Sequence, residues 1–384
     1  MNYKSTLKSS VAAAALFAIA APVAPSVNAA DDTLKSGNKN SLSISGQVVR
    51  ALYYADDGLS EKLFQSDGGI TSTRVRWVAK GTVDENVTMG ATLELNSPLS
   101  NSQASLKLHT GAAGAGSTDS ATSTTWGVRH QFVWVNHKRM GKISLGQTNA
   151  ASNGRSETTF SGVNMAADTG GVTYGNGISF IDTTGGTSSI STVTVNGAFT
   201  NNDGRSRTDV LRYDTPRFGG LALAVSAIAG GSWDVGADYR WKDGPVKFRA
   251  QAQYNSIAAT ATTTDAGFSF SAAALHDSGL NGGIAFGKGE RIGGLIEPSF
   301  IDVAVGYRAK IFGVGGTNFG MNVQHSDDVN QNNSDARSVG FTAAQLFNSV
   351  GASMALTYKS YSFDTATNTF DDIDVISLQT LFKF

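Results

Sequence analysis

The stretch IDVISLQTLFKF, Ile373 to Phe384, ends the chain on an aromatic residue. Counted back in twos from Phe384 to Ile376, one set of side chains is apolar except for Thr380, and the set between them is mostly polar. Because a β-strand sends alternate side chains to opposite faces, this predicts a strand with one apolar face. A terminal Phe exposed to water is an aggregation hazard, whereas it suits the aromatic girdle of a membrane β-barrel. The alternative is an edge strand of a soluble sandwich, which is disfavoured because the same alternation recurs along the chain.

The composition fits many short strands joined by tight turns. The 384 residues include 44 Gly, only 6 Pro and no Cys, with a formal net charge of -1. The lack of Cys excludes disulfides and thiolate metal sites, and the charge balance gives no indication of a nucleic-acid partner. Outside the N-terminus no apolar run approaches the roughly 18 residues of a membrane-spanning helix. A barrel needs none, because lumen-facing residues dilute its lipid-facing ones.

The N-terminus reads as an export signal. Lys4 and Lys8 precede an apolar run from Val11 to Ala21, and small residues lead to a cleavage site after Ala29. Residues 1–29 are therefore expected to be a signal peptide and 30–384 the mature barrel. A hydrophobic anchor helix is the alternative, which the short run disfavours. An exported bacterial chain of alternating strands is expected in the outer membrane.

The fold class predicted is all-β: a transmembrane antiparallel β-barrel of about 16 strands, with short turns at one end and long loops at the other. Trp233–Lys242 and Val246–Asn255 alternate most clearly. In Leu42–Tyr54, Arg50 falls on the apolar face, so either a bulge shifts the register or Arg50 lies near a membrane boundary. The segment Trp126–His137 is expected to place Val128, Phe132 and Trp134 on one face, with Arg129 and Gln131 on the other.

Residues 148–205 break the alternation. This stretch is rich in Gly and holds two weak strand-like pieces, Gly177–Ile181 and Ile190–Phe199. A loop this long inside a compact fold is expected to be functional. The favoured interpretation is a loop that enters the barrel, and the alternative is an extra hairpin that raises the wall to about eighteen strands.

Four short pieces resemble the general porins of Gram-negative bacteria: SLSISGQVVRALYY at the start of the barrel, GKISLGQ (Gly141–Gln147), LRYDTPRFGGLALAVSA (Leu211–Ala227) and the closing LFKF. The resemblance implies a homotrimer of sixteen-stranded barrels whose third loop folds inward and narrows the channel. It also implies that Phe384 is the signal read by the barrel-assembly machinery. The chain lacks the PEFGG-type loop tip of some members.

A barrel of about sixteen strands keeps an aqueous lumen, and charged side chains at its narrowest level set selectivity. The candidates on one wall are Arg74, Arg76, Arg129 and Arg50, and those on the opposing loop are Glu157, Asp168 and Asp182. The alternative is that these are solvated wall charges away from the constriction. A second basic group is expected near the periplasmic ends, either as a bias of the mouth toward anions or, for those next to turns, as headgroup anchors: Lys80, Arg240, Lys242, Lys247, Arg249, Arg308, Lys310 and Lys383.

Catalysis finds no support in the sequence. The five His residues lack metal-ligand spacing, and neither a GxSxG elbow nor a phosphate-binding loop is present. No enzyme activity, cofactor or metal is expected. The expected function is passive diffusion of small hydrophilic solutes and ions across the lipids of the outer membrane, with a weak lean toward anions. The alternatives are a substrate-specific channel, for example for sugars, and a structural or adhesive surface barrel.

Overall fold

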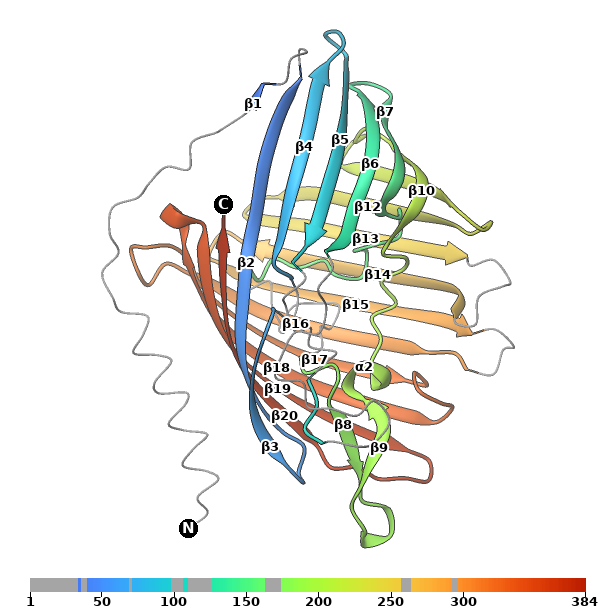
Figure 1. Ribbon diagram of the computed structural model, residues 1–384, viewed down its shortest axis with the longest axis vertical. Helices are drawn as coiled ribbons and strands as arrows, with labels where there is room; N and C mark the ends of the chain where they lie inside the picture. Colours follow the sequence, from blue (N-terminus) through green and yellow to red (C-terminus); the bar gives the residue numbers. More distant parts are fainter. Residues whose placement is uncertain are drawn as a thin grey trace.

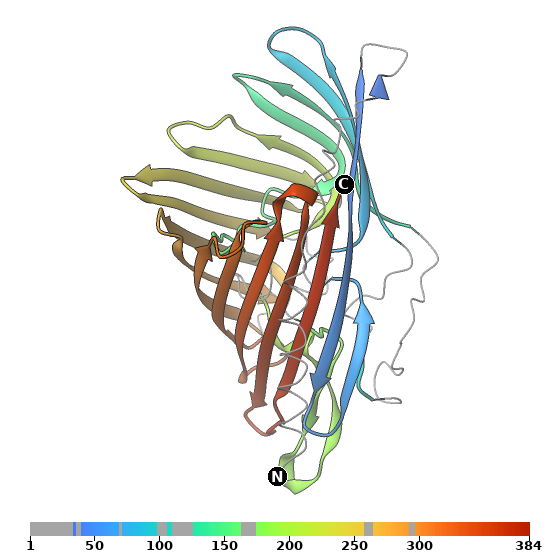
Figure 2. The same ribbon diagram turned by 90° about the vertical axis from the view of Figure 1, so that its left-hand side faces the viewer.

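The computed structural model describes residues 34–35, 40–68, 71–97, 106–109, 126–162, 174–256, 264–291 and 296–384. These residues form a closed antiparallel β-barrel with a sixteen-strand wall (Figures 1 and 2). Each wall strand pairs with its neighbour along the chain, and β20 (Ile373–Lys383) pairs with β2 (Ser41–Asp56) to close the barrel. Within these ranges, no helix has the length and apolar character needed to cross a membrane.

The second wall strand is divided into β3 (Glu61–Ser66) and β4 (Arg74–Thr82), and both pair with β2. A short β1 (Leu34–Lys35) pairs with the start of β2. The remaining wall strands are β5 (Val87–Asn96), β6 (Gly127–His137), β7 (Gly141–Asn149), β10 (Arg207–Asp214), β11 (Leu221–Ile228), β12 (Trp233–Asp243), β13 (Val246–Ser256), β14 (Thr264–His276), β15 (Leu280–Arg291), β16 (Ser299–Ala309), β17 (Thr317–Asp327), β18 (Ser334–Phe347) and β19 (Ala352–Thr365).

The two-faced strand at the C-terminus is confirmed. In β20, Ile373 and Val375 are buried inside the barrel, whereas Phe382 and Phe384 are exposed on the outer face. The strand lies between β19 and β2, as its position at the closing edge requires. Two buried apolar residues on the inward face are unusual for an aqueous lumen, and the inserted loop described below accounts for them.

Aromatic side chains gather near both ends of the outer face. On β12 and β13, Trp233 lies 5.6 Å from Tyr254, measured between ring centroids, at the ends that carry the long loops. At the opposite ends, Trp241 stacks on Phe248 with centroids 4.7 Å apart. Aliphatic side chains such as Val235 lie between the two groups and are exposed. This banding is typical of a barrel surrounded by lipid.

Gly46 makes room for the last residue of the chain. The Gly46 N–H donates to the carbonyl of Phe384 at 2.8 Å, and the Phe384 N–H donates back at 3.1 Å. A Cβ at position 46 would come within 2.5 Å of the Phe384 ring. The Phe384 ring therefore lies directly against Gly46 at the closing edge of the barrel, and any larger residue at 46 would displace it.

The division between β3 and β4 changes the register of the wall. Ala51 pairs with Ser66 above the break and Gln47 pairs with Arg74 below it. In between, the Thr73 hydroxyl accepts from the Val49 N–H at 3.0 Å and donates to the Val49 carbonyl at 3.2 Å. One side chain thus satisfies the β2 groups that the break leaves without a strand partner.

A β-bulge in β6 overturns the predicted faces of that strand. Glu94 pairs with His130 but Leu95 pairs with Val128, which leaves Arg129 as the extra residue. Beyond the bulge, Phe132 and Trp134 point into the lumen, where the Lys142 ammonium lies 5.4 Å from each ring centroid. The expectation that these rings share an outward face with Val128 is therefore wrong.

Between β7 and β10 the chain leaves the wall and enters the barrel. The two strand-like pieces form a hairpin, β8 (Ser179–Asp182) with β9 (Ser189–Thr194), joined by η3 (Thr184–Gly186) and followed by α2 (Val195–Ala198). This hairpin is a separate two-stranded sheet, so the wall keeps sixteen strands. Figure 1 shows it at the end of the barrel that carries the long loops.

An apolar cluster fixes the inserted hairpin to the inner wall. Ile178, Phe180 and Val195 of the loop pack with lumen-facing residues that include Tyr361 and Ile373. The Tyr174 N–H donates to the Tyr361 hydroxyl at 2.6 Å within this cluster. The apolar inner ends of β19 and β20 are therefore the docking surface of the loop.

Candidate functional site in the lumen

Two limbs of the inserted loop run along the polar inner wall, and we call residues 150–162 the first limb and 199–206 the second limb. In the first limb, the Thr158 hydroxyl donates to the Gln251 side chain at 2.6 Å, and the Gly162 carbonyl accepts from the Asn318 side chain at 2.9 Å. The polar alternation of β13 and β17 thus supplies the groups that hold the loop backbone.

The second limb is held in the same way. Gln324 donates to the Thr200 carbonyl at 2.8 Å, and Gln253 donates to the Asn202 carbonyl at 2.9 Å. Asp203 then joins the two limbs by accepting from the Gly154 N–H at 2.9 Å and the Ser156 hydroxyl at 2.9 Å. Because their backbones are bonded to the wall at several points, the two limbs form a fixed lining of one side of the lumen.

On the other side of the lumen, three arginines surround Glu94, and we call them with Glu94 the Glu94 cluster. The Glu94 Oε1 atom is 2.7 Å from Arg129 Nε and 3.7 Å from Arg74 Nη1, and Arg76 pairs with Oε2. Glu94 is fully buried, whereas 44% of the Arg76 side chain is exposed. One carboxylate beneath three guanidinium groups leaves a surface of positive charge facing the lumen.

The structure brings together three of the four predicted wall arginines. Arg50 does not join them, because β2 and β20 keep one register from Gln47 to Asp56. That register leaves Arg50 on the outward face with Val48 and Leu52, which are both exposed. The bulge that would have turned Arg50 inward is not present in this strand.

The two predicted loop acids that the structure describes, Glu157 and Asp182, lie in different parts of the inserted loop. Asp182 lies at the hairpin, where it accepts from the Thr184 N–H at 2.9 Å and from Asn368 of the last external loop at 2.8 Å. Hydrogen bonds from Thr184, first from its side chain, hold the pKa of the Asp182 carboxyl below its ordinary value. Glu157 accepts from Asn201 in the second limb at 3.1 Å. Asp168 lies outside the described residues.

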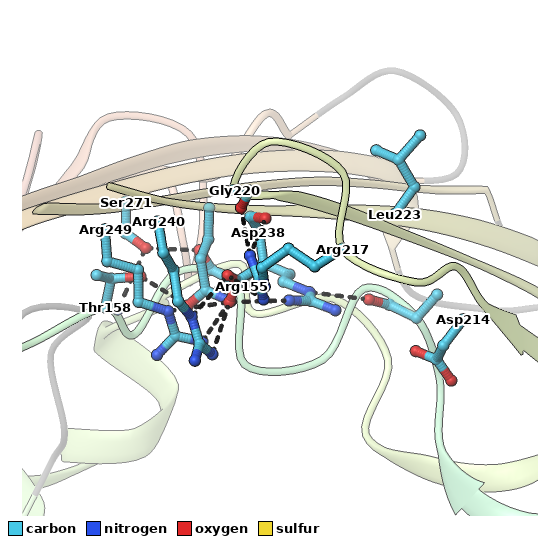
Figure 3. A network of polar contacts seen from close by, with 12 residues as sticks. Arg155, Thr158, Asp214, Arg217, Gly220, Leu223, Asp238, Arg240, Arg249 and Ser271 are labelled. Carbon is cyan, nitrogen blue, oxygen red and sulfur yellow. Dashed lines mark hydrogen bonds and ion pairs between the residues drawn. The ribbon is translucent and has the colours of Figure 1, made fainter. Parts of the chain in front are cut away.

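A second arginine-rich group, the Asp238 cluster, lies on the inner face of β12 and β13 (Figure 3). Four guanidinium groups approach the Asp238 carboxylate: Arg249 at 2.5 Å, Arg240 at 2.9 Å, Arg217 at 3.0 Å and Arg155 at 3.8 Å. Arg155 comes from the first limb and Arg217 from the turn before β11. The cluster therefore links loop, turn and wall around one negative charge.

The Asp238 cluster corrects, for Arg240 and Arg249, the expectation that basic residues beside the turns are headgroup anchors. Arg240 shares the parity of the buried Asp234 and Asp238, so it faces the lumen rather than lipid. Alternation alone placed Asp238 and Arg240 on one face, but Arg155 and Arg217 carry no periodic signal. Their convergence on Asp238 is visible only in three dimensions.

Metal-ligating side chains occur together at one place among the described residues. His325 Nε2 lies 2.8 Å from Asp335 and 3.1 Å from Asp327, on the outer face at the external ends of β17 and β18. Arg337 also pairs with Asp335 at 3.1 Å. This group is remote in the fold from the lumenal clusters and contributes nothing to them.

A closed barrel with an apolar banded exterior and a charged inner wall defines a membrane β-barrel of the channel type. The chain belongs to the Gram-negative porin family, whose model matches residues 10–366. It is thus an outer-membrane porin.

Solved structures show the same fold at low identity. The chain is similar to an anion-selective porin from Comamonas acidovorans (12% identity, TM-score 0.58, 90% of this chain and 100% of that chain). It is also similar to OmpT, an outer membrane protein of Vibrio cholerae (12% identity, TM-score 0.57, 92% of this chain and 100% of that chain). A third similar structure is the outer membrane channel DcaP of Acinetobacter baumannii (14% identity, TM-score 0.57, 92% of this chain and 99% of that chain). Among curated proteins none matches.

Proposed function

We propose that this porin is a passive diffusion channel for small hydrophilic solutes and ions, with a preference for anions. The observation that carries the proposal is the excess of guanidinium groups over carboxylates in the two lumenal clusters. Three surround Glu94 and four surround Asp238. Arginine keeps its charge in any local field, so the excess is permanent. A cleft lined by one sign of charge concentrates the opposite ion, and at 0.1 M salt the effect extends about 10 Å.

The assembly is part of the same proposal. We expect export by the N-terminal signal peptide, insertion into outer-membrane lipids by the barrel-assembly machinery, and a homotrimer. A trimer form is among the solved structures of Vibrio cholerae OmpT that the chain resembles, at 12% identity and a TM-score of 0.55. We propose no enzyme activity, because the carboxylate at the centre of each arginine cluster is already paired with several guanidinium groups and is a poor general base.

A substrate-specific channel is the second candidate, and the bulge in β6 is the observation that favours it. Phe132 and Trp134 face the lumen with Lys142 above both rings. Aromatic faces with a nearby polar group are suited to sugar rings. Saturable block of the ion current by a neutral oligosaccharide, lost in Trp134→Ala, would favour this candidate over the general pore.

Planar-bilayer recording of the purified protein tests the proposal. We expect stepwise ohmic conductance. In a KCl gradient, the reversal potential should have the sign that a higher permeability for chloride than for potassium produces. Replacing Arg74 and Arg76 by Gln removes two charges of the Glu94 cluster and should move the reversal potential toward cations. The matched control is Arg337→Gln, because Arg337 is exposed on the outer face. Absence of conductance would refute the channel, and an unchanged reversal potential would show that the Glu94 cluster does not set selectivity.

A further inference from the structure

The inner face of β12 and β13 carries like charges directly opposite each other. Arg240 pairs across the strands with Arg249, and Lys242 pairs with Lys247 one step nearer the periplasmic turn. Like charges in directly opposed positions destabilise a sheet. Two such pairs in succession, both on the face of the buried Gln251, indicate that a negative partner offsets them.

Asp238 supplies only part of that partner. It accepts from Arg240 through Nε at 2.9 Å and Nη2 at 3.2 Å, and from Arg249 through Nε at 2.9 Å and Nη2 at 2.5 Å. The same carboxylate also faces Arg155 and Arg217. One negative charge is therefore divided among four cations.

The remaining donors of the opposed pair are available. The Nη1 groups of Arg240 and Arg249 have no protein partner among the described residues. The Arg240 side chain is 55% exposed and that of Arg249 is 28% exposed. Beyond Lys247 a recess of about 780 Å³ opens, lined also by Arg308 and Asn318. Lys247 lies two residues from Arg249 on the same face of β13, so space for a hydrated ion opens at the edge of this basic group.

We propose that Arg240 and Arg249, with Lys242 and Lys247, bind a multivalent oxyanion of the phosphate or sulfate class. A guanidinium group presents parallel N–H donors that match two oxygens of one oxyanion, and two such groups side by side can hold a tetrahedral ion from two directions. A halide offers no pair of oxygens and gains only the charge attraction. The site faces the lumen, so its ligand is a free solute ion rather than a lipid headgroup.

The inference rests on the proposed function, since it names the solute class that the channel retains most strongly on its passage. The Glu94 cluster lies elsewhere on the inner wall, on β4, β5 and β6, and is not part of this site. An ion held at β12 and β13 therefore shares the channel with ions that pass the Glu94 cluster. Sulfate at millimolar concentration should accordingly reduce the chloride current in a saturable manner.

The test compares wild type with the double variant Arg240→Gln/Arg249→Gln. Single-channel chloride conductance is recorded while potassium sulfate or potassium nitrate is added at fixed chloride and ionic strength. We expect saturable reduction by sulfate and not by nitrate, with the half-effect concentration raised at least tenfold in the double variant. Arg139→Gln, in the turn after β6, is the matched control and should behave as wild type. A linear sulfate effect, or the same half-effect concentration in the double variant, would overturn the inference.

A second measurement separates this inference from the proposed function. Isothermal titration of the detergent-solubilised porin with sulfate reports binding whether or not the channel conducts. Saturable binding that is lost in the double variant supports the oxyanion site whether or not the protein conducts. Absence of conductance would refute only the proposed pore. Anion-selective conductance without saturable binding overturns the site alone. If the Gln variant fails to fold, Arg240→Lys/Arg249→Lys keeps both charges but removes the forked donors, and its sulfate affinity should fall while its reversal potential stays unchanged.

Discussion

Truncating Phe180 to Ala should release the inserted hairpin from the wall. Phe180 is fully buried, with its ring centroid 5.3 Å from that of Phe363 and 6.4 Å from that of Phe370. Removing a buried Phe side chain costs about 3–5 kcal/mol, and the low end applies here because a loop can partly close the cavity. The wall strands keep their own hydrogen-bond ladders, so the cost falls on docking of the hairpin. Because each tenfold change in an equilibrium constant corresponds to about 1.4 kcal/mol, the undocked population should rise roughly a hundredfold.

Limited proteolysis and single-channel recording measure this change. The undocked hairpin should be cleaved within residues 174–200 under conditions that leave the wild-type loop intact, and the open-channel current should become noisier. Phe341→Ala is the matched control, because Phe341 is exposed on the outer face and does not contact the loop cluster. Equal cleavage rates and equal current noise in wild type and Phe180→Ala would show that the apolar cluster does not hold the loop.

Three further predictions concern the closing edge and the external tip. Gly46→Val should displace the Phe384 ring and lower the temperature at which the folded form is lost on a heated gel, whereas an unchanged temperature would contradict the packing. Deleting Phe384 should reduce insertion into the outer membrane more than it reduces the conductance of the protein that does insert, and normal yield would count against an assembly signal. Because the pKa of Asp182 is lowered in the fold, its bonds to the hairpin and to Asn368 contribute stability at every pH above the ordinary carboxyl pKa of about 3.9 and lose it as pH falls through the folded value. Hairpin proteolysis should therefore rise only below about pH 4, and Asp182→Asn should remove that dependence.

The alternation of apolar and polar residues predicted most of the wall correctly, because in a regular strand this alternation alone determines which side chains face lipid and which face the lumen. In β12, Trp233 and Trp241 face outward and Asp234 and Asp238 face inward, as the period of two requires. The same rule places Arg50 outward, and the register of β2 shows that the rule holds there without a bulge. The sixteen-strand wall and the closure by β20 follow from this local information.

Features made by a single extra residue or by distant segments were not predictable in the same way. The bulge at Arg129 reverses the faces of every residue that follows in β6, yet it leaves no distinct mark in composition. The alternation in β5 places Glu94 on the inward face, as the structure does. The contact between Arg129 and Glu94, however, depends on the register shift in β6. Arg155 and Arg217 reach Asp238 from an irregular loop and a turn, where no period fixes the direction of a side chain.

The hairpin tip and the last external loop are joined by their backbones. The Thr183 N–H donates to the Thr369 carbonyl at 2.9 Å, and the Asp371 N–H donates to the Ile181 carbonyl at 2.9 Å. Two loops almost two hundred positions apart in the chain thus share one scaffold, in which these backbone bonds are joined by side-chain bonds such as that from Asn368 to Asp182. At this point of the entrance, the shape of the barrel mouth therefore depends on the path of two distant backbone segments that are bonded to each other.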